Sequence, residues 1–325
     1  MPVICLWRNP QRPGARLDPI FDIEKQHGKL ERKRKVTMKT FDQLSNVPPP
    51  EVVLYHAECI DGFGAAWALW KRFPKARYVP VKHGFPPPEG LTNRHVVMVD
   101  FSYHRETIDE MADQVASLHI LDHHVTAQEA LADLPFAYFD MSKSGAVLAW
   151  EWVHAEPVPW LLQYVQDKDL WQWKLESSRE ISAALSSYPF EFSVWDQLKF
   201  DTLKIEGAGI LRYENSLLEK IIKAAIVMPF AGYQVPVVHS PILTSQIGEQ
   251  LSGNHPFCVI WHQKDRRRYF SLRSREGGIS VAEIAAQFGG GGQTHAAGFY
   301  IPLDANPASV LDHIKSLPSH SSSRV

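Results

Sequence analysis

Residues 117–124 read Ser-Leu-His-Ile-Leu-Asp-His-His. The apolar run predicts a short buried strand, which stops on an acid and two imidazoles, Asp122, His123 and His124. Open α/β sheets keep their sites at the carboxyl ends of their strands. The chain holds 15 histidines, so a doublet alone could also mark a surface turn or a buried structural histidine. The interpretation as a metal site therefore depends on whether other segments repeat the pattern.

Two earlier segments repeat the pattern of a strand that ends on a metal-binding side chain. Val52–Tyr55 is followed by His56 and, in a glycine-containing turn before a helical stretch, by Asp61; His95–Val99 is followed by Asp100. Parallel strands joined by right-handed crossovers bring their carboxyl ends to one edge, so these side chains are expected to converge. Buried like charges would destabilise that edge unless cations neutralised them. The pattern predicts an α/β fold with divalent metal ions at one edge of a parallel sheet.

The types of side chain narrow the choice of metal. Carboxylates and imidazoles with little thiolate suit Mn²⁺ or Mg²⁺, and Fe²⁺, Co²⁺ and Zn²⁺ remain open. Two ions about 3.5–4 Å apart activate a water and stabilise both oxygens of a displacement at phosphorus. We therefore expect two divalent ions, with Mn²⁺ the best suited, and hydrolysis of a phosphate ester.

Composition sets the outer limits of function. The chain has 325 residues, 45% of them hydrophobic, and a formal net charge of −2, which is typical of a globular protein with no global nucleic-acid signal. The three cysteines are widely scattered, which argues against a fold held together by disulfides and indicates a reducing compartment. No apolar run reaches membrane-spanning length and the opening lacks a secretory hydrophobic region. These features predict a cytoplasmic protein without a membrane partner.

The expected domain organisation has five parts. Residues 1–48 are basic and aperiodic, which predicts a poorly ordered extension, and residues 49–200 are expected to form the catalytic domain. A linker helix is expected over 201–230, a substrate-binding domain over 231–318 and a tail over 319–325. The apolar stripe of the linker helix predicts a core contact or a homodimer contact.

The expected second domain carries its own motif. Strands are predicted at Gln234–Val238 and Phe257–Trp261, with a helix at Ser245–Leu251 between them. Ser280 has the spacing of a capping box and opens a further helix, which runs into Gly289–Gly292. Four glycines expose backbone amides, which suits the binding of phosphate, although flexible linkers have the same composition.

The motifs resemble those of the DHH phosphoesterase family, which includes RecJ-like exonucleases, nanoRNases, cyclic-dinucleotide phosphodiesterases and family II pyrophosphatases. The resemblance rests on four acidic motifs in order: His56 with Asp61-Gly62, Val99-Asp100-Phe101-Ser102, Asp122-His123-His124, and Asp167-Lys168-Asp169-Leu170-Trp171. The glycine run, preceded by Ser271-Leu272-Arg273-Ser274, is similar to the DHHA1 domain that accompanies DHH domains. The resemblance implies an N-terminal DHH lobe, with helices on both faces of a parallel sheet, and a smaller C-terminal α/β lobe of the DHHA1 type.

The resemblance also implies roles for individual residues. His56 would bind one ion, Asp61, His123 and Asp167 the other, and Asp100 would bridge the two. Asp122 would orient an imidazole, and His124 would face the scissile phosphate as a donor or proton carrier. Arg273 would clamp a substrate phosphate. The residues that would contact the nucleotide are Gly290, Gly291, Gly292, Gln293 and His295.

The chain departs from the family pattern at two positions. Cys59 stands where many members carry an aspartate, so Glu58 or the Cys59 thiolate could replace that ligand, or Cys59 could simply pack in the turn. Gln293 stands where the family usually has histidine, with His295 two residues on. Glutamine donates a hydrogen bond but carries no charge.

The sequence predicts a metal-dependent phosphohydrolase that cleaves phosphodiester bonds in short single-stranded oligonucleotides or dinucleotides. The alternatives in the same class are a cyclic-dinucleotide phosphodiesterase and a nucleotide bisphosphate phosphatase. A nucleotide-binding module with weak or lost catalysis is the alternative of another class, because of Cys59 and Gln293. The expected partner is a short single-stranded nucleic acid or a nucleotide.

Overall fold

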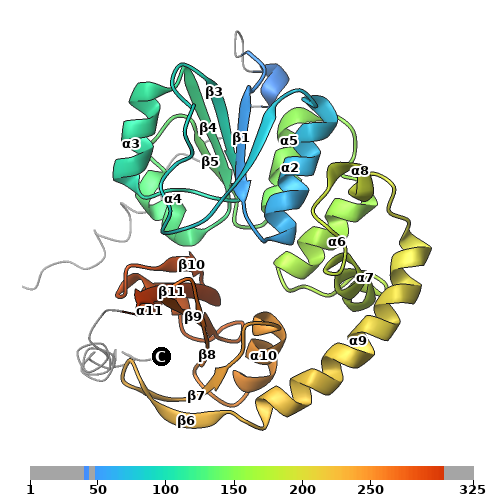
Figure 1. Cartoon of the computed structure of the whole chain (residues 1–325), viewed down its shortest axis with the longest axis vertical. Helices are drawn as coiled ribbons and strands as arrows, with labels where there is room; N and C mark the ends of the chain where they lie inside the picture. The colour runs from blue at the N-terminus through green and yellow to red at the C-terminus, as the bar shows by residue number, and fades with distance from the viewer. Residues whose placement is uncertain (1–39, 44–47, 304–325) are drawn as a thin grey trace, which may run out of the picture. The chain divides into compact units, whose positions relative to one another are not determined.

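Two β-sheets organise the part of the chain that the computed structural model describes, residues 40–43 and 48–303 (Figure 1). All of these residues belong to one unit, 38–325. Most of the expected extension and the last 22 residues, 304–325, lie outside the described ranges. A short 3-10 helix, η1 (Phe41–Gln43), precedes the first sheet.

The first sheet is parallel throughout and has the strand order β2-β1-β3-β4-β5. Its strands are β1 (Val52–His56), β2 (Arg77–Val81), β3 (His95–Val99), β4 (Ser117–Asp122) and β5 (Ala137–Phe139). In the register of the three central strands, Leu54 pairs with Met98, and Met98 pairs with Ile120. The three strands predicted to end on histidine or aspartate are therefore neighbours, and their carboxyl ends share one edge.

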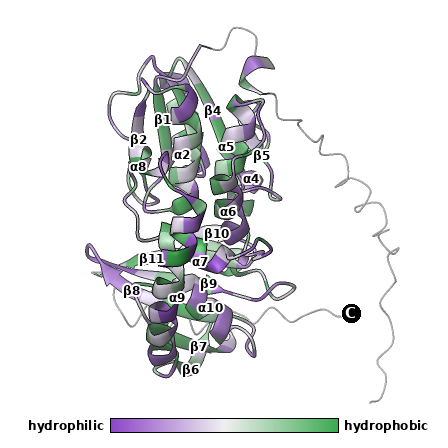
Figure 2. Cartoon of the chain, turned by 90° about the vertical axis from the view of Figure 1, so that its right-hand side faces the viewer, coloured by the Kyte–Doolittle hydropathy of each residue, from purple (hydrophilic) through white to green (hydrophobic). Residues whose placement is uncertain are grey.

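Helices cover both faces of this sheet, which confirms the predicted α/β class. The helices of this half are α2 (Ile60–Arg72), α3 (Arg105–Gln114), α4 (Val125–Leu131), α5 (Gly145–Val153) and α6 (Trp160–Asp169). On one face of the sheet, Val53, Val97 and Leu121 pack into a hydrophobic core shared with α2, α5 and α6. On the other face, the alternate residues Leu54 and Met98 pack into a hydrophobic core shared with α3 and α4. The central strands are coloured as largely hydrophobic in Figure 2 because both faces are buried.

The sequence pattern did not predict the edge strand β2. It lies at the margin of the sheet and contains Pro80, which cannot donate a ladder hydrogen bond. Proline is tolerated there because an edge strand needs hydrogen bonds on one side only.

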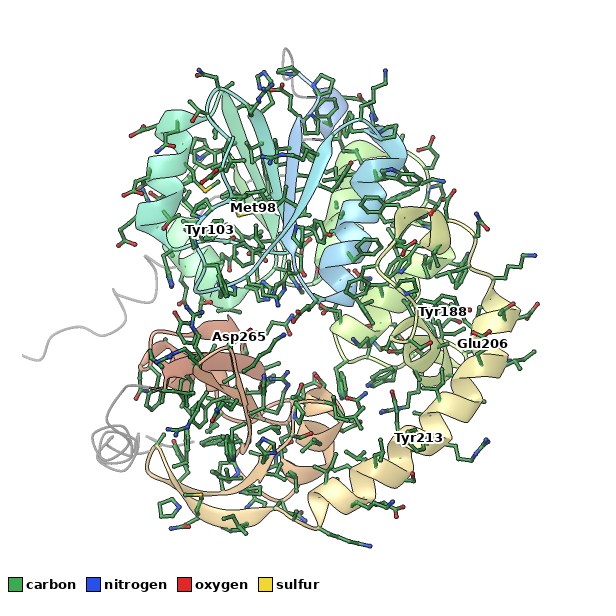
Figure 3. The ribbon with its side chains drawn as sticks, viewed as in Figure 1. Met98, Tyr103, Tyr188, Glu206, Tyr213 and Asp265 are labelled. Carbon is green, nitrogen blue, oxygen red and sulfur yellow. The ribbon has the colours of Figure 1, made fainter. Side chains whose placement is uncertain are left out.

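Three helices lie between α6 and the second sheet: α7 (Ser178–Leu185), α8 (Phe192–Trp195) and α9 (Phe200–Ile222). Helix α9 passes so close to α7 that a Cβ on Gly207 would lie 1.8 Å from the carbonyl oxygen of Glu180. Next to this contact, the Tyr188 hydroxyl donates to Glu206 over 2.7 Å (Figure 3).

Within the described ranges, no helix is both long enough and apolar enough to span a bilayer.

The second sheet has six strands in the order β10-β11-β9-β8-β7-β6. They are β6 (Ile226–Phe230), β7 (Tyr233–His239), β8 (Cys258–Lys264), β9 (Arg267–Arg273), β10 (Gly291–Gln293) and β11 (Ala296–Pro302). Its helices are α10 (Thr244–Leu251) and α11 (Val281–Ala286), and the Ser280 hydroxyl caps α11 by accepting from the Glu283 amide. The β7 and β8 pair is parallel and the other pairs are antiparallel, so this half is α/β with a mixed sheet.

Two expectations about this half differ from the structure. The linker helix expected over 201–230 ends at Ile222, and Ile226–Phe230 forms an edge strand instead, because Pro229 is excluded from a helix interior. The glycine run is not an open loop: Gly291–Gln293 pairs with β11. A Cβ on Gly290 would lie 2.1 Å from the Gly298 carbonyl oxygen, so glycine is required by close backbone approach.

Candidate metal centre

Asp61 lies in the first turn of α2 and faces the first turn of α5. Its carboxylate accepts the amides of Gly145 (2.6 Å) and Ala146 (3.0 Å), where the helix dipole favours a negative charge. A Cβ on Gly62 would lie 2.4 Å from the His56 carbonyl oxygen, so glycine lets α2 start directly against the end of β1. Burial and the charges of neighbouring aspartates raise the pKa of Asp61 well above its usual value.

Asp100 follows β3 in a left-handed backbone conformation, φ 54°, which few residues other than glycine adopt. Its Oδ1 lies 3.1 Å from His123 Nε2, and its Oδ2 lies 3.5 Å from His56 Nδ1. Burial acts to raise the pKa of this carboxyl, but the attraction of the His123 and His56 imidazoles outweighs it and holds the pKa below its usual range. One carboxylate thus reaches in two directions.

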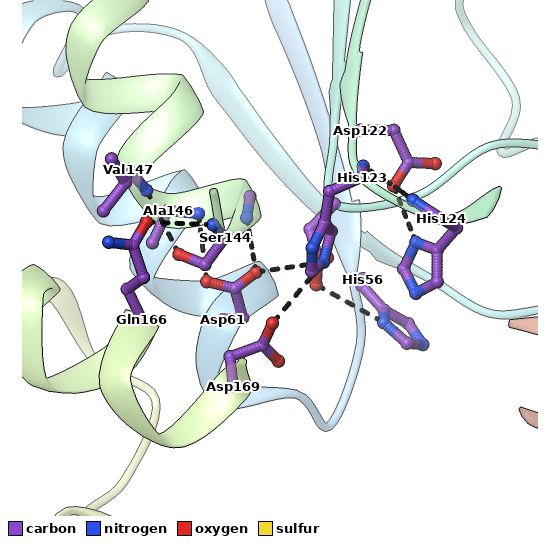
Figure 4. Close-up of polar contacts among 12 residues, drawn as sticks. His56, Asp61, Asp122, His123, His124, Ser144, Ala146, Val147, Gln166 and Asp169 are labelled. Atoms are coloured by element: carbon purple, nitrogen blue, oxygen red, sulfur yellow. Dashed lines mark hydrogen bonds and ion pairs between the residues drawn. The ribbon is translucent and has the colours of Figure 1, made fainter. Parts of the chain in front are cut away.

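His123 lies among three carboxylates (Figure 4). Its Nε2 is 3.1 Å from Asp100 Oδ1 and 3.6 Å from both Asp61 Oδ2 and Asp169 Oδ2. Burial acts to lower the pKa of this imidazole, but the three acids raise it well above its usual value. In the absence of a metal, a proton on His123 is thus the local counter-charge for the acids.

Asp122 is completely buried and holds His124 in place. Its Oδ1 accepts from the His123 amide (2.7 Å) and meets His124 Nδ1 at 2.6 Å, while its Oδ2 accepts from the Ser102 hydroxyl (2.6 Å). Both oxygens are therefore engaged, and the other ring nitrogen of His124, Nε2, is the one left to meet a ligand. The contact with Nδ1 fixes the orientation of the His124 ring, and the expected positioning role of Asp122 stays a prediction.

Two buried oxygens of the cluster accept no hydrogen bond. Asp61, Asp100 and His123 are at most 3% exposed, yet Asp100 Oδ2 has no hydrogen-bond partner, and neither has Asp169 Oδ2. Buried carboxylate oxygens in this condition are costly unless a cation meets them. Potential ligand atoms form three groups, and within each group all of these atoms lie within 4.8 Å of one another. The groups are Asp61, His123 and Asp169; His56, Cys59 and Asp100; and Asp100, Asp122, His123 and His124. These residues fit divalent metal ions.

Asp169, and not the predicted Asp167, lies in the cluster. Asp167 points away from it and accepts the amides of Lys174 (2.9 Å) and Leu175 (3.3 Å). The two acids are two residues apart in α6, about 200° around the helix axis, so only one can face the cluster. Asp167 instead anchors the loop after α6, in which Trp171 and Trp173 both have positive φ.

The two aspartates of α6 are expected to respond in opposite ways to amide substitution. Asp167→Asn should lower the free energy of unfolding by about 1–3 kcal/mol, because each carboxylate oxygen accepts one amide and asparagine keeps only one of the two acceptors. Asp169→Asn should leave the metal-free protein at least as stable, because one of several crowded like charges disappears, while metal binding is lost. Denaturant unfolding in a chelator and equilibrium dialysis with Mn²⁺ measure the two effects; the reverse result would restore Asp167 to the cluster.

The structure also separates Glu58 from Cys59. Glu58 is turned outward and pairs with Lys82 at 2.6 Å, which makes it unsuitable as the replacement ligand. Cys59 lies beside His56 and Asp100. Its pKa is raised well above the usual thiol value by burial and by the charges of Asp100 and Asp61.

One residue beside the cluster was missed in the sequence. The ring centroid of His83 lies 4.4 Å from that of Phe101, with the rings tilted, and 6.0 Å from that of His56. It belongs to the Pro-rich segment after the unpredicted strand β2, so no strand pattern marked its position.

The residues predicted to bind substrate lie in the second sheet. Arg273 ends β9 and donates to the Leu272 carbonyl and, at 3.4 Å, to the Ser245 hydroxyl. Its Nε is buried without a hydrogen-bond partner, and among the described residues no ion pair includes Arg273. Gly292 donates its amide to Thr126 over 3.3 Å, and His295 Nδ1 meets the Ser274 hydroxyl at 2.9 Å. Arg273 thus keeps unused donors, whereas Gly292 and His295 already have partners.

A separate cavity lies at the opposite edge of the parallel sheet. It has a volume of about 800 Å³ and is lined at the amino ends of β1 and β2 by Pro49, Glu51, Arg72, Arg77 and other residues. Its lining carries four basic side chains, Arg72, Lys75, Arg77 and Arg94, and one acid, Glu51, which pairs with Arg94 at 2.6 Å. It contains none of the three groups of potential metal ligands, so the candidate site stays at the carboxyl edge.

Comparison with known proteins places the chain in a family. An uncharacterized protein of Acanthamoeba polyphaga mimivirus is 30% identical over 290 residues, which cover 79% of this chain and 69% of the viral protein. The chain belongs to the same family as this viral protein. No family model matches the chain.

Solved structures show a more distant likeness. A pGpG-specific phosphodiesterase, PggH, from Vibrio cholerae is 14% identical, with a TM-score of 0.44 over 82% of this chain and 99% of PggH. RecJ from Thermus thermophilus in complex with Mn²⁺ is 13% identical, with a TM-score of 0.42 over 81% of this chain and 51% of RecJ. An exopolyphosphatase-related protein from Bacteroides fragilis is 13% identical, with a TM-score of 0.39 over 80% and 88% of the two chains. At these scores the function must be sought in the residues of this chain.

Proposed function

We propose that the chain is a DHH-type phosphohydrolase that uses two divalent metal ions to cleave phosphodiester bonds in short single-stranded oligonucleotides or dinucleotides. The observation that carries the proposal is the convergence of Asp61, Asp100, His123 and Asp169 at the carboxyl edge of a parallel sheet. Buried carboxylate oxygens without hydrogen-bond partners are what such a cluster needs to hold cations. These residues also carry the motif order that resembles the DHH family.

Two sets of ligands divide the cluster. Asp61, His123 and Asp169 form one set, and His56 belongs to the other. Asp100 lies between them, with one oxygen toward His123 and the other toward His56, as expected for a bridging carboxylate. Mn²⁺ suits this donor set and Mg²⁺ is an alternative. Bound ions would neutralise the phosphate and activate the attacking water.

His124 is the side chain suited to move a proton to the leaving oxygen. Asp122 holds its Nδ1, so the ring presents Nε2 in a fixed orientation. Burial acts to lower the pKa of His124, but the charges of Asp122 and Asp100 raise it above its usual value. In its protonated form this imidazole can donate a hydrogen bond or a proton.

Arg273 is the residue suited to bind a second phosphate of the substrate. A guanidinium with an unpartnered buried Nε and no ion pair in the described ranges is expected to seek an anion. A nucleic-acid substrate carries a phosphate beyond the scissile one, which gives this arginine a partner. This argument favours oligonucleotides and dinucleotides, bound in the expected contact with Gly290–Gly292, Gln293 and His295. A homodimer and a cytoplasmic location stay predictions.

The test is hydrolysis of a panel of substrates with Mn²⁺: RNA and DNA dinucleotides, a labelled pentamer, cyclic dinucleotides and a nucleotide bisphosphate. We expect stepwise shortening of the pentamer by the wild type and none by Asp169→Asn. Cleavage of cyclic dinucleotides or the bisphosphate alone would replace the proposed substrate class by one of these alternatives. Binding of nucleotides without turnover of any substrate would favour a binding module.

A further inference from the structure

We propose that Cys59 is a thiolate ligand of one metal ion, which makes that position selective for a borderline ion such as Zn²⁺ over Mn²⁺. The inference deepens the proposed function and rests on its metal centre. It replaces a uniform pair of hard ions by a pair of different character, with sulfur on one side only.

The geometry of the three side chains is the first argument. The Sγ of Cys59 and potential ligand atoms of His56 and Asp100 all lie within 4.8 Å of one another. Zinc binds sulfur at about 2.3 Å and nitrogen or oxygen at about 2.0–2.2 Å. Three atoms at this spacing can meet one ion after small side-chain movements. Sulfur, nitrogen and oxygen donors together are a usual set for Zn²⁺.

The unpartnered oxygen of Asp100 is the second argument. Asp100 is 2% exposed, and its Oδ2 accepts no hydrogen bond, although it lies 3.5 Å from His56 Nδ1. This oxygen belongs to the same group of three residues as Cys59. A buried carboxylate oxygen beside an imidazole and a thiol needs a cation more than a further neutral neighbour.

The alternatives for Cys59 are weaker. The residue occupies the N-cap position of α2, but its side chain makes no capping hydrogen bond. Glu58, the other candidate ligand, is engaged with Lys82 and Lys264 and is turned outward. A role in packing alone would leave the Asp100 oxygen without a partner.

Ligation is balanced chemically and changes the preferred metal. The thiol releases its proton to solvent, and a sulfur lone pair forms the bond to the ion, so no oxidant or reductant is needed. Thiolate is a soft donor that favours Zn²⁺ and Co²⁺, whereas Mn²⁺ and Mg²⁺ favour oxygen donors. The set of Asp61, His123 and Asp169 contains no sulfur and keeps the harder preference.

Titration of the metal-free full-length protein with Co²⁺ tests the proposal without any assay of activity. A cobalt–thiolate bond gives an intense charge-transfer band in the near ultraviolet, in addition to the weak visible bands of any bound cobalt. We expect the band in the wild type, in Cys258→Ser and in Cys5→Ser, and its loss in Cys59→Ser. Cys258 is a matched control because it begins β8, is buried against α10, and lies outside the three groups of ligands.

A second variant keeps the number of ligands while changing their hardness. Cys59→Asp should lose the charge-transfer band, still bind two ions, and lower the ratio of Zn²⁺ affinity to Mn²⁺ affinity by more than about tenfold. A band that survives in Cys59→Ser, or a wild type that binds two cobalt ions without the band, would overturn the role of Cys59 while leaving the metal centre intact. Failure of every variant and of the wild type to bind any ion would overturn the proposed function as well.

Discussion

Replacing Asp100 by asparagine is expected to lower the rate of hydrolysis by more than about 100-fold. Substituting residues that only hydrogen-bond to metal ligands already lowers activity by up to about 100-fold, and Asp100 is itself a proposed ligand. Asp100 places one oxygen 3.1 Å from His123 Nε2 and the other 3.5 Å from His56 Nδ1, and the uncharged amide offers one oxygen only. The fold should survive, because asparagine is nearly isosteric and adopts the left-handed φ of 54° as readily as aspartate. Metal content by mass spectrometry and steady-state turnover on the pentamer measure the effect.

Asp133→Asn is the matched control for this prediction. Asp133 is an exposed aspartate that pairs with Arg105 at 2.8 Å, so the same chemical change there removes a surface ion pair and nothing else. Turnover of Asp133→Asn should equal that of the wild type. An Asp100→Asn enzyme that kept both ions and its rate would refute the bridging position of this carboxylate.

The parallel half of the molecule could be predicted from the sequence because its rules are local. Each central strand is an apolar run that stops on histidine or aspartate, and the handedness of the crossovers fixes where those ends meet. Asp61, Asp100, Asp122, His123 and His124 therefore come together as expected. Edge elements were missed because their composition is ambiguous: β2 contains a proline, and β10 consists largely of glycine.

The motif alone does not contain the information that decides which of Asp167 and Asp169 faces the metal cluster. Both acids stand in one short run, and the choice depends on how far α6 continues and which side of its last turn faces the sheet. The helix includes both residues, and the backbone amides of Lys174 and Leu175 occupy Asp167. A prediction that extended the helix to Asp169 could have placed the two acids on opposite sides of that helix. It could not have said which acid faces the cluster, because the amides that bind Asp167 come from a loop without periodicity.

The metal-free protein is expected to lose stability as pH rises above 6.5, the usual pKa of histidine, and to regain it on binding metal. The pKa values of His56, His123 and His124 are raised in the folded state, each with burial acting against the attraction of nearby aspartates. Their contribution to stability is full below 6.5 and disappears as pH rises through the raised folded values. Asp61 acts in the same direction, because burial and its acidic neighbours let the folded state keep a proton that the unfolded state releases. Asp100 and Asp122, whose pKa values are lowered, contribute fully throughout this range.

Divalent ions should reverse this loss, since they take the place of the protons among the acids. An ion at 100 times its dissociation constant adds about 2.7 kcal/mol per site, and its affinity rises with pH because protons no longer compete. We therefore expect the difference in Tm between the Mn²⁺-loaded and the chelated protein to widen from pH 6 to pH 8.5. Calorimetry at several pH values measures it, with Asp169→Asn as the variant in which the widening should shrink. A difference that stayed constant with pH would mean that the ions bind away from His123 and its acidic neighbours.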